Sequence, residues 1–174
     1  MTCLLKKIWF FWLLAFSFSL FAPPARAAQE FDTNFTATYL VNPAGATTVT
    51  QDIRLTNKLA NVYASEYTLT IGSTKISQIS ATTPQGYLPS AVTTTDNSTS
   101  IHLKFPESHQ VVGKDQTLSF TMSYQNQDIA SKNGRVLEVN IPQLANLEDL
   151  NSYTVTLLVP TSFDLPTLIS PPPT

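Results

Sequence analysis

Apolar and polar residues alternate along most of the chain beyond residue 30. Between residues 118 and 124, for instance, every second residue is large and apolar, and the residues between them are serine or threonine. A period of two residues directs one set of side chains to a core and the other to solvent, which predicts a β-strand. The pattern predicts strands at residues 31–41, 49–56, 63–71, 101–105, 118–124, 136–141 and 153–159, and weaker strands at 76–79 and 88–95.

Turn-forming residues separate these segments, and no segment beyond residue 27 keeps a helical period for ten residues. About eight or nine short strands with frequent turns are typical of an all-β, antiparallel β-sandwich, immunoglobulin-like or similar. We assign this domain to residues 28–160 and expect one short helical turn at residues 144–151. The predicted core consists of apolar residues on the inner faces of the strands: Phe35, Tyr39, Ile53, Leu55, Tyr67, Leu69, Leu103, Phe105, Leu118, Phe120, Val155 and Leu157.

Two places depart from the regular alternation. Gln51 interrupts the apolar face of its strand, which predicts either a β-bulge or a polar pocket at that position. Residues 126–135 are mostly polar, and we expect a loop with a turn at Asn133–Gly134, because Asn-Gly favours tight turns.

The first 27 residues have the features of a secretory signal peptide. Lys6 and Lys7 precede an uncharged run of 14 residues from Ile8 to Phe21, and Ala25-Arg26-Ala27 offers a cleavage site. The alternative is an uncleaved membrane anchor, but the run is shorter than the roughly 20 residues that a spanning helix needs. We therefore expect a bacterial protein that is secreted or held in the cell envelope, and that meets the membrane only through this segment before cleavage.

Removal of the signal peptide would leave 147 residues, enough for one domain with its own core. It would leave 7 basic and 12 acidic residues, which is a net charge of −5. Nucleic-acid binding is not expected, because Lys and Arg are not concentrated anywhere in the chain. The only cysteine, Cys3, lies in the signal peptide, so residues 28–174 have no thiol for catalysis, metal binding or disulfides.

Residues 161–174 contain Pro166 and the run Pro171–Pro173. Proline-rich segments favour extended conformations, so we expect a linker or tail. A linker would suggest that the chain is one part of a longer protein, and a frayed terminus is the alternative.

Motifs for chemistry are scarce. His102 and His109 fall at solvent-facing or turn positions, and Glu148–Asp149 is typical of a solvated loop. Neither a G-x-S-x-G elbow nor a phosphate-binding glycine loop occurs in the sequence. We therefore predict no catalytic, cofactor-binding or metal-binding residue, no cofactor, and no enzymatic activity for this chain by itself.

Candidate contact residues come from the polar stretch and from one exposed aromatic residue. Asp128, Lys132, Asn133 and Arg135 would form a contact loop at one end of the sandwich. The structural alternative, which we favour, is a long hairpin connection with Asp128 and Lys132 in solvent. Tyr87, between Gly86 and Leu88 in a turn region, is the best exposed candidate for stacking on a sugar, but we favour packing in the core or in a loop as its role.

Most of residues 31–160 also carry a family resemblance. The matching segments are residues 31–41, 49–57, 63–67, 111–116, 123–124 and 128–130, Gly134, and residues 138–142. They resemble the N-terminal β-sandwich region of secreted bacterial transglutaminase-like proteins, where that region precedes a papain-like catalytic domain that uses Cys, His and Asp. The resemblance implies an accessory domain, and it carries no catalytic residue onto this sequence.

Three functional hypotheses follow from these patterns. The leading hypothesis is a non-catalytic, extracytoplasmic accessory or interaction domain of a transglutaminase-like envelope protein, whose partner is a downstream catalytic domain or another envelope protein. The second is a free-standing secreted module for surface binding or adhesion. The third is a hydrolase whose site the sequence does not reveal.

Overall fold

The computed structural model describes residues 30–142, 150–163 and 166–170. The predicted signal peptide, nearly all of the predicted helical turn at 144–151 and part of the proline-rich tail lie outside the described residues.

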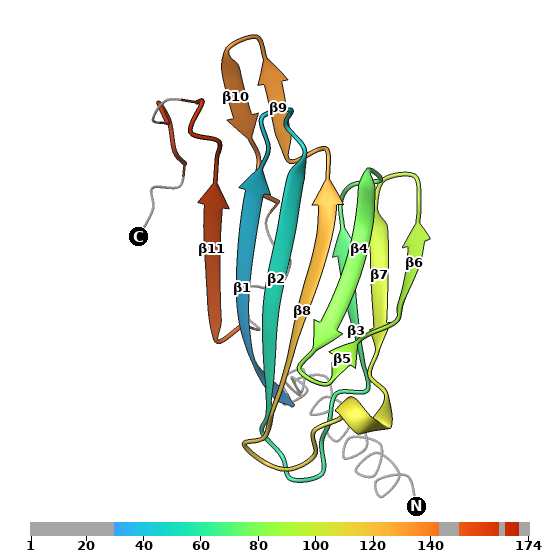
Figure 1. Ribbon diagram of the computed structural model, residues 1–174. Coiled ribbons are helices and arrows are strands. Elements are labelled where there is room, and N and C mark those ends of the chain that lie inside the picture. The colour runs from blue at the N-terminus through green and yellow to red at the C-terminus, as the bar shows by residue number, and fades with distance from the viewer. Residues whose placement is uncertain (1–29, 143–149, 164–165, 171–174) are drawn as a thin grey trace, which may run out of the picture.

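The described residues form a sandwich-like, all-β fold of two larger sheets and a separate hairpin (Figure 1). Sheet A is defined by β1 (Phe31–Val41), β2 (Thr47–Asn57), β4 (Ile76–Thr83), β5 (Gly86–Tyr87), β8 (Thr117–Asn126) and β11 (Ser152–Leu158), in the spatial order β11-β1-β2-β8-β4-β5. Sheet B consists of β3 (Glu66–Ile71), β6 (Ser90–Thr94) and β7 (Thr99–Lys104), in the order β3-β7-β6. The hairpin consists of β9 (Ala130–Asn133) and β10 (Val136–Val139).

The two sheets pack through a core that the alternation predicted. Phe120 of sheet A meets Tyr67 and Phe105 edge-on, with ring centroids 5.1 Å apart in each pair. Such aromatic pairs add to the stability gained by burying their area. Tyr67 is partly buried against the core, and nine of the other predicted core residues are buried: Phe35, Tyr39, Ile53, Leu55, Leu69, Leu103, Phe105, Leu118 and Phe120.

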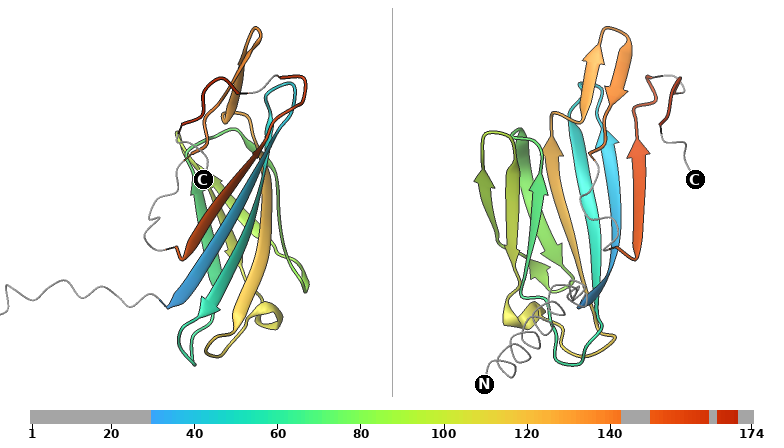
Figure 2. Two further views of the ribbon diagram at one scale, coloured as in Figure 1. Left: turned by 90° about the vertical axis from the view of Figure 1, so that its left-hand side faces the viewer. Right: turned by 180° about the vertical axis from the view of Figure 1, so that it is seen from behind.

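The prediction was wrong for Val155 and Leu157 on β11, which are 38% and 41% exposed. Sheet A has six strands and sheet B has three. Sheet B covers the side of β8 and β4 and leaves β11 on the uncovered side, as the view from behind shows (Figure 2). The alternation within β11 is therefore regular, but the opposite sheet does not extend far enough to bury its inner side chains.

The antiparallel prediction was wrong for one strand pair, because β11 pairs in parallel with β1. β11 begins at the end of the sandwich opposite the β9–β10 hairpin and runs beside β1 in the same direction (Figure 1). The other strand pairs in the described part of the chain are antiparallel.

The predicted loop at residues 126–135 is partly a strand. Ala130–Asn133 forms β9 and pairs with β10, with Asn133 opposite Val136. The turn therefore lies at Gly134–Arg135, one residue later than predicted. Gly134 has φ of +64°, and a two-residue hairpin turn readily accepts glycine with positive φ at its first central position.

The register of β2 runs through Gln51 without a shift, so the position is not a β-bulge. Gln51 lies instead in a polar pocket. Its side chain is 2% exposed, and its amide nitrogen donates to the Tyr124 hydroxyl at 3.3 Å. Its side-chain oxygen has no partner among the described residues. Burial raises the pKa of Tyr124, and it raises that of the neighbouring Tyr39 to about 12.

Candidate interaction surfaces

Rows of polar side chains cross the outer face of sheet A. Directly opposed residues on neighbouring strands project to the same face, so the register identifies each row. One row crosses all six strands and consists of Thr154, Thr36, Asp52, Thr121, Thr82 and Tyr87, in the order β11, β1, β2, β8, β4, β5. The next row consists of Ser152, Asn34, Arg54 and Ser119 on β11, β1, β2 and β8.

A polar groove with a volume of about 730 Å³ lies over these two rows. The turn at Thr83–Pro84 contributes to one side of it. The volume is within the range of small-ligand sites in proteins. The side chains of the two rows that line the groove are Thr36, Asp52, Thr121, Thr82, Ser152, Asn34, Arg54 and Ser119.

The groove contains one carboxylate and one guanidinium, both from β2. Asp52 accepts a hydrogen bond from the Thr121 hydroxyl at 2.6 Å. Arg54 lies two residues away on the same face, is exposed, and forms no ion pair with another described residue. Ser152 donates to Asn34 at 2.7 Å. The groove thus combines hydroxyl, amide and charged groups without a net charge.

The groove residues do not stand out in the sequence. Each of them appears in the sequence as an ordinary solvent-facing position of a strand. Only the register between strands that are distant in sequence shows that they form adjacent rows.

Tyr87, for which the sequence favoured packing over ligand contact, is 64% exposed. Its partner on β4 is Thr82, which lines the groove. Tyr87 therefore projects from the same face as the groove and lies at the end of its longer row.

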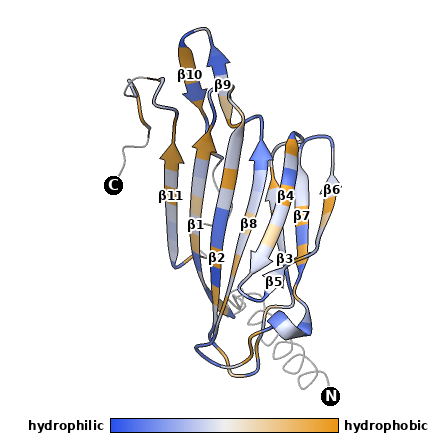
Figure 3. Ribbon diagram, in the orientation of Figure 1, coloured by the Kyte–Doolittle hydropathy of each residue, from blue (hydrophilic) through white to orange (hydrophobic). Residues whose placement is uncertain are grey.

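The second candidate surface is the edge of sheet A at β11. This strand pairs with β1 on one side and is the last strand in the sheet order. Its sequence, Ser-Tyr-Thr-Val-Thr-Leu-Leu, contains no charge and no proline. The ends of β11 and β1 are apolar (Figure 3), and the exposed apolar residues are Leu40, Val155, Leu157, Leu158 and Val159.

The hydrogen-bond pattern shows which backbone N–H and C=O groups of β11 face away from β1. In the β1–β2 pair, Asn42 N donates to Ala46 O and Lys58 N donates to Glu30 O, so even-numbered residues of β1 face β2. Odd-numbered residues of β1 then face β11, and the parallel register assigns Ser152, Thr154 and Thr156 as their partners. The backbone groups of Tyr153, Val155 and Leu157 therefore face the open edge.

The predicted contact residues do not lie together in the structure. Lys132, Asn133 and Arg135 are exposed at the tip of the β9–β10 hairpin (Figure 1). The Lys132 ammonium lies 5.6 Å from the centre of the Phe163 ring, within the range of a cation–π contact. Tyr87 belongs to the opposite end of the sandwich, so it does not share a surface with the hairpin tip.

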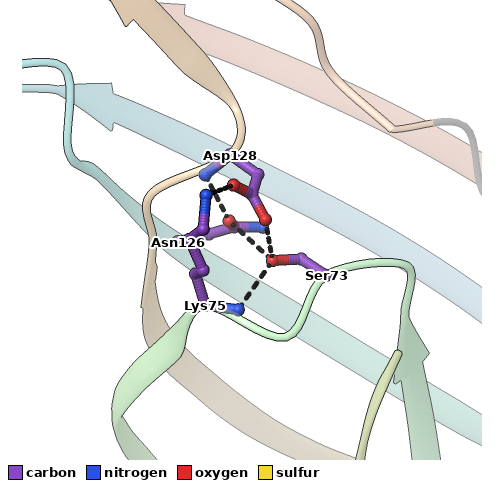
Figure 4. A network of polar contacts seen from close by, with 4 residues as sticks. All are labelled: Ser73, Lys75, Asn126 and Asp128. Carbon is purple, nitrogen blue, oxygen red and sulfur yellow. Dashed lines mark hydrogen bonds and ion pairs between the residues drawn. The ribbon is translucent and has the colours of Figure 1, made fainter. Parts of the chain in front are cut away.

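Asp128 is exposed, as the favoured prediction had it, and its carboxylate is also held by hydrogen bonds. It accepts hydrogen bonds from the Ser73 hydroxyl at 2.6 Å and from the Lys75 ammonium at 2.8 Å (Figure 4). These bonds, from Lys75 first and Ser73 second, lower the pKa of Asp128. Asn126 joins the network by accepting from the Asp128 backbone N–H at 2.8 Å. This network ties the turn after β3 to the end of β8, which is a structural role.

His102 lies on the outer face of sheet B, with its side chain 41% exposed, in agreement with the predicted surface position. Its Nδ1 is 3.0 Å from the Thr68 hydroxyl, and its Nε2 is 3.6 Å from Glu66. These are contacts between neighbouring strands on an open sheet face.

Among the described residues, no three His, Cys, Asp or Glu side chains form a group that could hold a metal ion. No helix in the described ranges is long and apolar enough to span a membrane. Neither protein-family models nor curated proteins match the chain. The relationship to transglutaminase-like proteins therefore stays a prediction from the sequence.

Proposed function

We propose that this chain is a non-catalytic, extracytoplasmic interaction domain that recruits a partner by strand addition at β11. The observation that carries the proposal is the open edge of β11, which is uncharged and has exposed apolar side chains on both of its faces. Natural sheet edges are usually protected by charge, proline or a covering segment, because an unprotected edge pairs with other strands. In the part of the chain that the structure describes, β11 has no charge, no proline and no strand paired to its outer edge, which favours a role in strand pairing.

The partner with matching chemistry is an extended, mostly apolar segment. Its backbone would pair with Tyr153, Val155 and Leu157, and its side chains would cover the exposed leucines and valines. The resemblance to transglutaminase-like proteins suggests that this segment belongs to a catalytic domain of the same envelope protein. In that arrangement the domain described here would orient the catalytic part.

Proline substitution separates strand addition from folding. Val155→Pro removes an N–H that faces the open edge and leaves the bonds to β1 intact, whereas Val155→Thr keeps the N–H. We would place a photoreactive residue at Leu157 in the cells that make the protein, and at Val92 on β6 as an apolar control of similar exposure. We expect one dominant cross-linked partner from position 157, lost in Val155→Pro and kept in Val155→Thr.

Identical adducts from both positions, or an adduct that persists in Val155→Pro, would contradict strand addition. The size of the native polypeptide tests the accessory role separately, by blotting with an antibody to residues 28–160. A band much larger than the 147-residue product would support an accessory domain. A band at that size would support the free-standing binding module.

A further inference from the structure

The polar groove on sheet A is independent of the β11 edge and has its own chemistry. Its lining offers side-chain hydroxyls, the Asn34 amide, the Asp52 carboxylate and the Arg54 guanidinium. These groups match a ligand that is itself rich in hydroxyls, because carboxylate and guanidinium each bind two neighbouring polar groups at once. The single positive and single negative charge favour a neutral ligand over a strongly charged one.

Tyr87 adds the apolar part of such a site. Its ring is exposed and projects from the same face, directly beside Thr82 of the groove. A sugar ring has one apolar face and a polar rim, so it pairs with an aromatic side chain on one side and hydrogen-bond partners around it. Tyr87 provides the aromatic ring, and the polar row beside it provides the hydrogen-bond partners.

The length of the row sets the size of the ligand. Tyr87 on β5 is separated from Asp52 on β2 by β4 and β8. Three strand spacings correspond to about 14 Å. A ligand that reaches from the tyrosine to the two charged residues is therefore longer than one sugar ring.

We propose that the outer face of sheet A binds a neutral oligosaccharide that lies across the strands. One sugar ring stacks on Tyr87, and the following units bond to the hydroxyl groups and to Asp52, Arg54 and Asn34. This site goes beyond the proposed strand addition, and Val155→Pro leaves it intact.

Calorimetric titration tests the site with cellohexaose and chitohexaose as neutral probes and cellobiose as the short probe. We expect one of the hexaoses to bind at least about tenfold more tightly than cellobiose. Tyr87→Ala should weaken this binding about tenfold, Tyr87→Phe should retain it, and Tyr63→Ala, which removes another exposed tyrosine, should leave it unchanged. Asp52→Asn should also weaken binding, although the amide can still accept the Thr121 hydrogen bond.

Two results would overturn the proposal. One is that both hexaoses fail to bind with a Kd below about 1 mM to the folded chain. The other is that Tyr87→Ala and Tyr63→Ala have equal effects, since the ring would then have no specific place in the site. Tight binding of an acidic polymer that salt abolishes, without binding of neutral hexaoses, would reduce the groove to an electrostatic contact at Arg54.

Discussion

At the scale of single residues, the polar groups inside the sandwich are the least ordinary feature. Gln51 is buried beside Tyr124, and Tyr39 and Tyr153 lie in the same region of the core, on the inner faces of β1 and β11. A buried amide oxygen without a partner among the described residues costs stability, whereas the amide nitrogen of Gln51 is satisfied by the Tyr124 hydroxyl. Burial also keeps these tyrosines neutral, because a phenolate would lose its hydration.

An alkaline titration should reveal this burial. The pKa of Tyr39 is raised by burial to about 12, above the value near 10 of an unfolded chain. A raised pKa stabilises the fold below pH 10, and this contribution is lost as the pH rises from 10 to about 12. We expect tyrosinate absorbance of Tyr39, Tyr67 and Tyr124 to appear late and together with loss of the strand circular dichroism. Ionisation of all six tyrosines in one step near pH 10 would contradict this expectation.

Neighbouring residues on β8 should differ sharply in their effect on stability. Phe120→Ala removes a buried ring that contacts Tyr67 and Phe105, and it should lower the free energy of unfolding by about 3–5 kcal/mol. Thr121→Ala removes one hydrogen bond to the exposed Asp52 and should cost less than about 1 kcal/mol. Urea unfolding measures the free energy of unfolding of both variants. Similar small losses of stability in the two would mean that the two faces of β8 are wrongly assigned.

At the scale of elements, β11 is the strand whose environment differs most from its sequence pattern. Its alternation is that of a half-buried strand, yet its inner side chains are partly exposed and one of its edges is open. The parallel pairing with β1 holds it through backbone bonds and the contact between Phe35 and Tyr153, whose rings are 5.6 Å apart.

Proline at successive positions of β11 should have unequal effects on stability. Thr156→Pro removes an N–H that bonds to β1, whereas the N–H of Val155 faces the open edge. We expect Thr156→Pro to destabilise the fold by about 1–3 kcal/mol more than Val155→Pro, measured by thermal or urea unfolding. The reverse order would show that the assignment of the free backbone groups is wrong.

At the scale of the whole molecule, the difference in width between the sheets decides which surfaces are available. Sheet B is three strands wide and covers only part of sheet A. Sheet B lies on the inner side of sheet A (Figure 2), and no described strand pairs with the outer edge of β11, so the outer face can take a ligand and the edge can take a strand. Binding at one surface does not obstruct the other, so one domain can present both.

Unfolding of the whole sandwich should be cooperative. Phe120 connects the core residues of both sheets, and one buried cluster spans them. We expect circular dichroism and tyrosine fluorescence to report coincident transitions in urea for residues 28–174. Separate transitions would mean that sheet B or the β9–β10 hairpin unfolds independently.

The fold class and most of the core follow from the sequence, because alternation at a period of two is a local property of each strand. The sequence also predicted either a β-bulge or a polar pocket at Gln51, and the strand register decided in favour of the pocket. The tertiary structure alone decided the parallel pairing of β11, the exposure of Val155 and Leu157, and the rows of the groove. Each of these depends on which strands become neighbours and how far the opposite sheet extends, and residues such as Asn34 and Ser152 meet only after 118 positions of intervening chain.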